Sequence, residues 1–353
     1  MHPLVQAFCY LCVVVTASCG AGKPAAMMDS GWKQYKQAFV QADGAVVDSG
    51  NKGISHSEGQ GYAMLLASAY GDRKGFRKLW SWTRTHLQIR DDRLFAWSWS
   101  PADGVKDKNN ATDGDLLIAW ALLRASERWD NPDYREAARL IAQDILEKLV
   151  FKVGDNTVLL PGEYGFHHED RWQINLSYWV YPALQALDRL VPDSRWQALV
   201  DSGKKLTRIM SQGDWKLPPD WVEITATTAP IPAPDHPSRF GYEAVRLPLY
   251  LVWSGEYTSD LLHNSQSFWQ QTSKRSYMPA WVDVVSGQEA EYPAPDGFRA
   301  IWQLTDRAID NAKSTGSVAA PDTALTKDLK GQDYYSASLL LLSRVAYKER
   351  FLQ

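Results

Sequence analysis

Two kinds of helical segment alternate along this chain of 353 residues. In the first kind, seen in 112–129, apolar side chains cover nearly the whole helix surface. In the second, seen in 132–149, they form one stripe opposite charged residues. A helix that is apolar on all sides must be surrounded by protein, whereas an amphipathic helix keeps one face in water. The alternation therefore predicts an all-α fold in which an inner ring of buried helices is wrapped by an outer ring.

The same periodicity predicts helices at 57–70, 73–88, 112–129, 132–149, 175–190, 193–211, 239–253, 257–271, 295–312 and 333–348. Sustained period-two alternation is rare, so few strands are expected. A proline-rich irregular segment, 212–238, and a polar connection, 313–332, interrupt the helices. Because apolar helices continue in the same style after 212–238, we expect one domain over 27–353 with a long loop on its active face.

The first residues are typical of an export signal. Residues 4–17 are mostly apolar, are too short to span a membrane comfortably, and lead into small residues, which predicts a leader over 1–26 and a periplasmic or secreted protein. Residues 16–19 also resemble a lipoprotein processing box, so a lipid anchor on Cys19 is the alternative. All three cysteines lie within the first nineteen residues, which excludes disulfides and cysteine-based metal sites from the mature chain.

Aromatic residues are the unusual part of the composition, with 16 tryptophans and 16 tyrosines. Many must be buried, because aromatic side chains carry large apolar surfaces. Those that stay exposed in a groove offer flat faces on which sugar rings stack. The formal net charge of −3 provides no basic field for nucleic acid.

Carboxylates stand at the start of two of the predicted buried helices. Glu58 opens one, and Asp113 and Asp115 open another. Since the entrances of the inner helices ring one face of the toroid, we expect these acids to face a shared cleft. Each acid also has a purely structural interpretation. Glu58 completes a capping box with Ser55, and first-turn aspartates stabilise the helix dipole.

Glu243 and Arg246 lie three residues apart at the start of an apolar segment, where they would share one face of a helix. They form either a structural ion pair or a carboxylate that a guanidinium holds ionised, as a general base requires. The run His167 to Asp170 is a poor metal site, because adjacent histidines do not share a helical face. No metal or other cofactor is expected.

Taken together, these motifs resemble glycoside hydrolase family 8, over nearly the whole mature chain. The segments that carry the resemblance are Trp32-Lys33-Gln34-Tyr35-Lys36, Ser57-Glu58-Gly59-Gln60-Gly61-Tyr62, Ala111-Thr112-Asp113-Gly114-Asp115, Leu160-Pro161-Gly162, Asn175-Leu176-Ser177-Tyr178, Pro219-Asp220-Trp221-Val222, Gly241-Tyr242-Glu243-Ala244-Val245-Arg246 and Asp333-Tyr334-Tyr335.

The resemblance implies an (α/α)6 barrel with a long open cleft that cuts internal β-1,4 bonds of glucan with inversion. It implies that Glu58 is the general acid and that Asp115 holds the distorted sugar at the cleavage point. The family's base is an aspartate, and Glu243 occupies that position here. The resemblance further implies a monomer whose partner is a β-glucan, with a functional link to a bacterial cellulose synthase complex.

The glutamate at position 243 is a departure from the family pattern. An inverting enzyme holds its two carboxyl groups roughly 6.5–9.5 Å apart so that a water molecule fits. Glutamate is one methylene longer than aspartate, and a displacement of about 1 Å can cost about a hundredfold in rate. Asp220 and Glu223, near the proline-rich loop, are the alternative bases.

Several aromatic residues are candidates for stacking on the glucan, with core packing as the alternative for each: Trp97, Trp99, Trp172, Tyr178 and Tyr335. Three other functions stay open at this point. The chain could bind glucan without cutting it, hydrolyse another polysaccharide such as xylan, chitosan or mixed-linkage glucan, or be a helical scaffold without a role in sugar chemistry.

Overall fold

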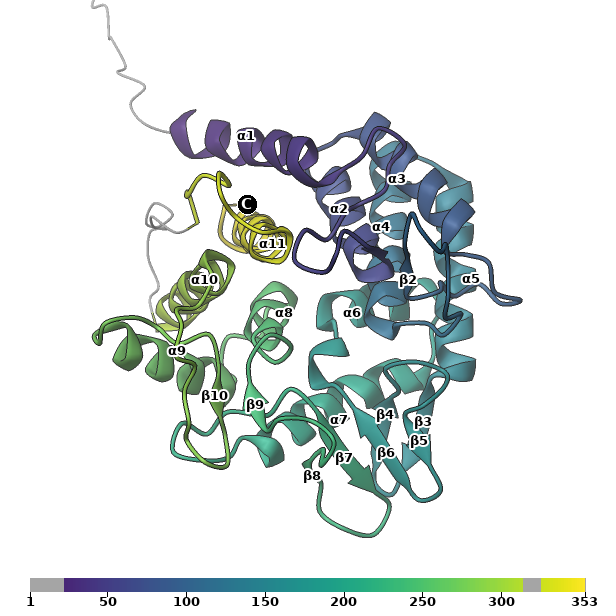
Figure 1. Ribbon diagram of the computed structural model, residues 1–353. Coiled ribbons are helices and arrows are strands. Elements are labelled where there is room, and N and C mark those ends of the chain that lie inside the picture. Colours follow the sequence, from purple (N-terminus) through teal and green to yellow (C-terminus); the bar gives the residue numbers. More distant parts are fainter. Residues whose placement is uncertain (1–21, 314–324, 353) are drawn as a thin grey trace, which may run out of the picture.

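The computed structural model describes residues 22–313 and 325–352, and its helices form two concentric layers (Figure 1). Within the inner layer α2 packs on α4, α4 on α6, α6 on α8, and α8 on α10 and α11, and α11 closes the ring on α2. The bounds of these helices are α2 Ser57–Ala69, α4 Thr112–Trp129, α6 Tyr181–Leu190, α8 Arg246–Ser254, α10 Asp296–Lys313 and α11 Tyr334–Phe351.

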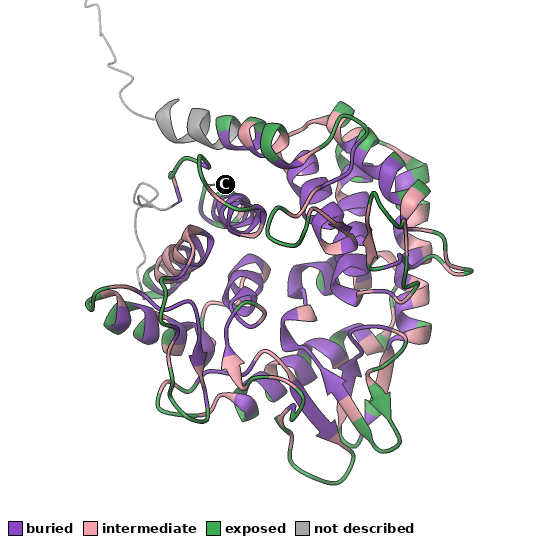
Figure 2. Ribbon diagram, in the orientation of Figure 1, coloured by how far each residue is buried: buried purple, intermediate pink, exposed green. Residues whose placement is uncertain are grey.

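The outer helices each cover a neighbouring inner helix, so that α3 packs on α2, α5 on α4, α7 on α6, α9 on α10 and α1 on α11. Their bounds are α1 Gly22–Phe39, α3 Arg73–His86, α5 Pro132–Lys148, α7 Ser194–Met210 and α9 Asp260–Ser273. The inner helices α2, α4, α8 and α11 are buried along most of their length, as Figure 2 shows, whereas α3 and the inner helix α10 each bury one stripe. The fold is thus an (α/α)6 barrel, which confirms the predicted fold class.

Close packing of α2 against α4 depends on glycine. A methyl group added at Gly114 would lie 2.2 Å from Ser57 Oγ and 2.8 Å from the Glu58 backbone nitrogen. One added at Gly61 would lie 2.6 Å from Leu117 Cβ. Real side chains do not tolerate such distances, because protein interiors are already close-packed. These glycines therefore let the two helix entrances, with their carboxylates, stand side by side.

Two predicted helices begin later than expected. In 175–190, a short 3-10 helix η1 (Leu176–Tyr178) comes first, and α6 starts with a proline in its first turn. In 239–253, the first two residues form strand β9 (Arg239–Phe240) and α8 starts only at Arg246. The intervening residues make a turn whose backbone amides are held by the Asp220 carboxylate. A tertiary contact therefore overrides the helical pattern.

Short antiparallel strands, largely missed by the periodicity, fill one side of the barrel opening. A four-stranded sheet has the order β5-β6-β7-β8, and three two-stranded ladders are β3-β4, β1-β2 and β9-β10. The remaining bounds are β1 Ser55–His56, β2 Ser98–Trp99, β3 Val150–Val153, β4 Asn156–Leu159, β5 His167–His168, β6 Arg171–Ile174, β7 Val222–Thr225, β8 Ile231–Pro232 and β10 Val282–Asp283. Two of these strands lie inside 212–238, which was expected to be irregular.

The N-terminal region falls partly outside the described residues, and so do the leader and Cys19. The expected start of the domain at residue 27 lies within α1. Between residues 22 and 313 and from 325 to 352, no helix combines the length and the apolar character needed to cross a membrane.

Candidate active site

The first turns of several inner helices surround a cavity of about 460 Å³. Glu58 is the second residue of α2, Asp113 the second of α4, Arg246 the first of α8 and Tyr335 the second of α11. Helix packing thus brings residues that are far apart in the sequence to one opening. The side chains of interest on its wall are Glu58, Trp97, Asp113, Tyr178, Tyr242, Glu243, Arg246 and Tyr335.

Arg246 is the centre of this cluster, and its side chain is almost fully buried. One terminal nitrogen, Nη1, donates to Glu58 and lies 3.2 Å from Asp113 Oδ2. The other, Nη2, donates to Glu243 and, at 2.8 Å, to Ser177 Oγ. Glu243 and Arg246 are therefore in contact, as their spacing predicted, although Glu243 precedes the helix.

Three carboxyl groups share this one guanidinium, so the cluster carries an excess of negative charge if all three are ionised. Burial raises the pKa of Glu243 to about 8, with further contributions from the neighbouring Asp220 and Asp113. Burial likewise raises the pKa of Asp113 to about 7. Near neutral pH the raised pKa favours a proton on Glu243 in the free site, so the contact with Arg246 does not hold this carboxyl group ionised. A carboxyl group must lose such a proton before it can act as a base.

Glu58 does not cap its helix. The cap is His56, whose Nδ1 accepts a hydrogen bond from the Gly59 amide at 3.1 Å, while Nε2 lies 3.3 Å from Asp48 Oδ2. The Glu58 carboxylate instead accepts a hydrogen bond from Tyr62 OH at 2.9 Å and binds Arg246. The capping-box interpretation is wrong, and the carboxylate faces the cavity.

The structure does not support the predicted contact between Asp115 and the sugar. Asp115 is 0% exposed, with Oδ1 accepting from the Phe95 amide at 2.9 Å and Oδ2 from Asn110 Nδ2 at 2.7 Å. It cannot hold a sugar directly, whereas Asp113 lines the cavity. Each residue of an α-helix advances about 100°, so side chains two positions apart point in nearly opposite directions. Only one of these two aspartates can therefore point into the cavity that Glu58 lines.

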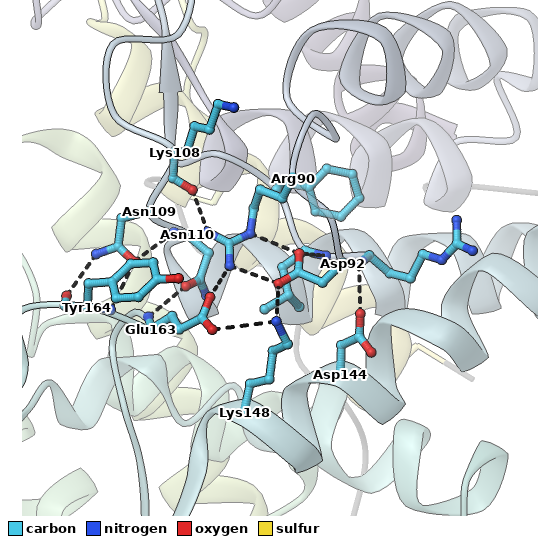
Figure 3. A network of polar contacts seen from close by, with 12 residues as sticks. Arg90, Asp92, Lys108, Asn109, Asn110, Asp144, Lys148, Glu163 and Tyr164 are labelled. Carbon is cyan, nitrogen blue, oxygen red and sulfur yellow. Dashed lines mark hydrogen bonds and ion pairs between the residues drawn. The ribbon is translucent and has the colours of Figure 1, made fainter.

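Asp115 instead binds Asn110. Asn110 belongs to a polar network that connects the loops around the cleft, and Figure 3 shows this network around Arg90 and Glu163. Asn110 Oδ1 accepts from the Glu163 amide at 2.8 Å, and the Glu163 side chain binds Arg90. Arg90 Nη2 in turn lies 2.8 Å from Asp92 Oδ2. The network therefore holds the residues that lead into α4, and with them the position of Asp113.

The five predicted stacking residues divide into two groups. Trp97, Tyr178 and Tyr335 line the cavity. Trp99 packs edge-on against Trp82, with ring centroids 5.3 Å apart, and Trp172 stacks on His167 at 4.6 Å; neither borders the cavity.

Tyr242, 40% exposed on the cavity wall, was not predicted. Its position directly before Glu243 in the family motif was the signal that could have indicated it.

The two alternative bases lie away from the cavity. Asp220 Oδ1 accepts from the backbone amides of Gly241 at 3.0 Å and Ala244 at 2.7 Å, so it shapes the turn that presents Glu243. Glu223 sits on β7, 3.6 Å from Arg171. Glu243 has a further partner in Asn175, whose Nδ2 donates to it at 3.1 Å. Of these three carboxyl groups, Glu243 is the one that lines the cavity.

Paired carboxyl groups beside exposed aromatic rings, at the open end of an (α/α)6 barrel, are what a glycoside hydrolase needs. A family model for glycosyl hydrolases family 8 matches residues 2–349. A "Probable endoglucanase" from Novacetimonas hansenii is 40% identical over 326 residues, which is 91% of each chain. An "Endoglucanase" from Cellulomonas uda is 38% identical over 284 residues, or 80% of this chain and 79% of that relative.

A solved structure gives the same result. Endo-beta-1,4-glucanase CMCax from Acetobacter xylinum matches with a TM-score of 0.83 and 39% sequence identity, covering 92% of this chain and 98% of that one. The chain belongs to glycosyl hydrolases family 8, which confirms the resemblance seen in its motifs.

Proposed function

We propose that this protein is an inverting endo-β-1,4-glucanase that hydrolyses internal bonds of cellulose or a related β-glucan. The observation that carries the proposal is the pair Glu58 and Glu243, which bind different nitrogens of Arg246 on the wall of one cavity that aromatic side chains also line. Family membership and relatives with endoglucanase names support it.

In the proposed reaction Glu58 gives its proton to the oxygen of the scissile glycosidic bond, which leaves with the departing chain. Glu243 takes a proton from a water molecule while that water attacks the anomeric carbon from the opposite face. One proton leaves Glu58 and one arrives on Glu243, so the two carboxyl groups exchange roles and solvent restores them. Asp113, rather than Asp115, binds hydroxyl groups of the sugar at the cleavage point.

The longer glutamate at position 243 is compatible with this role. Its carboxylate has two fixed partners, Arg246 and Asn175, and its backbone lies in the turn that Asp220 holds. Pre-organisation of this kind limits the loss that a displaced base would cause.

Exported cellulose is the substrate we infer for this activity. The leader predicted over residues 1–26 directs the chain to the periplasm or outside the cell, and the relative from Novacetimonas hansenii is a named endoglucanase. We infer that the protein trims glucan made by a cellulose synthase complex.

A second candidate function follows from glutamate in place of the family's aspartate, namely a glucan-binding protein without catalysis. The deciding experiment follows the viscosity of carboxymethyl-cellulose alongside the appearance of reducing ends. An endoglucanase gives a steep loss of viscosity per new reducing end. Glu58→Gln is the control. It should lower the rate of hydrolysis by about 10²- to 10⁴-fold and keep the affinity for cello-oligosaccharides. Unchanged viscosity with retained affinity would support the binding function instead.

A further inference from the structure

Few aromatic side chains are exposed in the part of the chain that the structure describes. Among the described residues, the aromatic side chains that are large and exposed are Trp97 at 38%, Tyr164 at 62%, Tyr242 at 40% and Tyr292 at 47%. Trp97 and Tyr242 line the cavity. Tyr292 lies outside the cavity wall, and its neighbours suggest a reason for its exposure.

Tyr292 belongs to a hairpin, residues 278–294, that is attached to the strand leading into the base. Within the hairpin, the Ala290 amide donates to the Trp281 carbonyl at 3.0 Å and the Ala280 amide to the Tyr292 carbonyl at 3.3 Å. Its strand β10 pairs antiparallel with β9, which immediately precedes the turn of Tyr242 and Glu243. Ala280, Trp281 and Ala290 form a small apolar cluster of their own. The hairpin is therefore a built part of the cleft rim.

The Tyr292 side chain is positioned through its hydroxyl group. Its hydroxyl accepts a hydrogen bond from Trp281 Nε1 at 3.1 Å, and the Arg239 guanidinium lies 3.6 Å from the centre of the Trp281 ring. The Tyr292 hydroxyl lies near that of Tyr242 and, after burial, contributes to raising the pKa of Tyr242 to about 12.

Tyr242 is equally constrained. Its ring packs against Phe298 and Tyr335, at centroid distances of 5.2 and 6.1 Å. Two partly exposed rings thus stand in fixed positions next to each other, one on the cavity wall and one beyond it.

We propose that Tyr292 forms an outer sugar-binding subsite that receives the glucan chain after it has passed Tyr242. A rigid exposed aromatic face binds the apolar face of a pyranose ring at little cost in side-chain entropy. The ligand class is a linear β-1,4-linked glucan long enough to extend past the cavity. This inference rests on the proposed function. The outer subsite would make the protein selective for longer glucan chains.

The test compares cellotetraose with cellohexaose. Tyr292→Ala should raise the KM for cellohexaose about three- to tenfold, leave kcat unchanged, and hardly affect cellotetraose. Tyr292→Phe keeps the ring and loses only the hydrogen bond from Trp281, so it should raise the KM for cellohexaose less than Tyr292→Ala does. Val285→Ala is the matched control, because Val285 is an exposed apolar residue at 68% on the same hairpin. Thermal unfolding of each variant reports any damage to the hairpin.

Calorimetric binding of both oligosaccharides, measured with Tyr292→Ala in the Glu58→Gln background, separates this inference from the proposed function. A loss of affinity confined to cellohexaose supports the outer subsite even if the wild type hydrolyses nothing. Equal losses for both sugars, or none for either, would overturn it, whatever the wild type hydrolyses.

Discussion

The cleft has two walls that are built in different ways. On one side, Glu58 and Asp113 stand in the first turns of α2 and α4, two long helices in close contact. On the other, Glu243 lies in a turn and Tyr292 on a hairpin, positioned by individual hydrogen bonds. Packing of whole helices fixes the helix wall, whereas a few polar contacts fix the loop wall. Changes at the packed positions of the helix wall should therefore act through packing and burial, and changes on the loop wall through charge and hydrogen bonds.

The sharpest test of the helix wall replaces each of its two aspartates, separately, with asparagine. Asp113→Asn should lower kcat by about a hundredfold with little change in stability, because it alters a group on the cavity. Asp115→Asn should mainly lower stability rather than kcat. It sets an amide against Asn110 Nδ2 and should cost about 1–3 kcal/mol of unfolding free energy, with kcat changed only a few-fold.

Both variants would be measured by steady-state kinetics and urea unfolding. The reverse pattern, with activity lost in Asp115→Asn and kept in Asp113→Asn, would contradict the placement of Asp113 at the substrate.

A smaller effect is expected where the two helices touch. Gly114→Ala would normally favour a helix, since alanine has the higher helix propensity by about 1 kcal/mol. Here the added methyl group would meet Ser57 and the Glu58 backbone, so we expect a net loss of about 1–3 kcal/mol and a lower kcat. Urea unfolding decides the sign. A gain in stability would mean that α2 and α4 separate freely.

The loop wall can be tested by removing one charge. Asp220 contributes, after burial, to the raised pKa of Glu243, and Asp220→Asn should lower that pKa. Both backbone amides bind Oδ1 of Asp220, so asparagine can keep them.

A base with a lower pKa is deprotonated at lower pH. The rising limb of kcat/KM against pH should therefore move to lower pH, by up to about one unit. A pH profile of the variant checks this, with Val285→Ala as a control outside the charge cluster. A shift to higher pH would show that Asp220 acts through the shape of the turn alone.

The same contrast explains what the sequence could predict. The range 112–129 was predicted to the residue, because apolar periodicity reports a helix buried by its neighbours. The choice of Asp115 over Asp113 failed because a motif does not state which way a helix faces.

On the loop wall, the hydrophobic periodicity of the sequence predicts little of the structure. Strands of two to four residues such as β8 and β6 are too short to show alternation. The range 239–253 was expected to be helical throughout, and only the distant Asp220 explains why its first residues are not. Tyr292 has no local signal at all, since its role depends on contacts with Trp281 and Tyr242.

The central claim is that Glu58 and Glu243 act as acid and base on opposite faces of the sugar. Proton NMR of the first products released from cellohexaose tests it most directly. Inversion predicts that new reducing ends appear first as the α anomer and change to the equilibrium mixture afterwards. An early excess of the β anomer would mean retention through a covalent intermediate, and would contradict the role of Glu243 as a base that activates water.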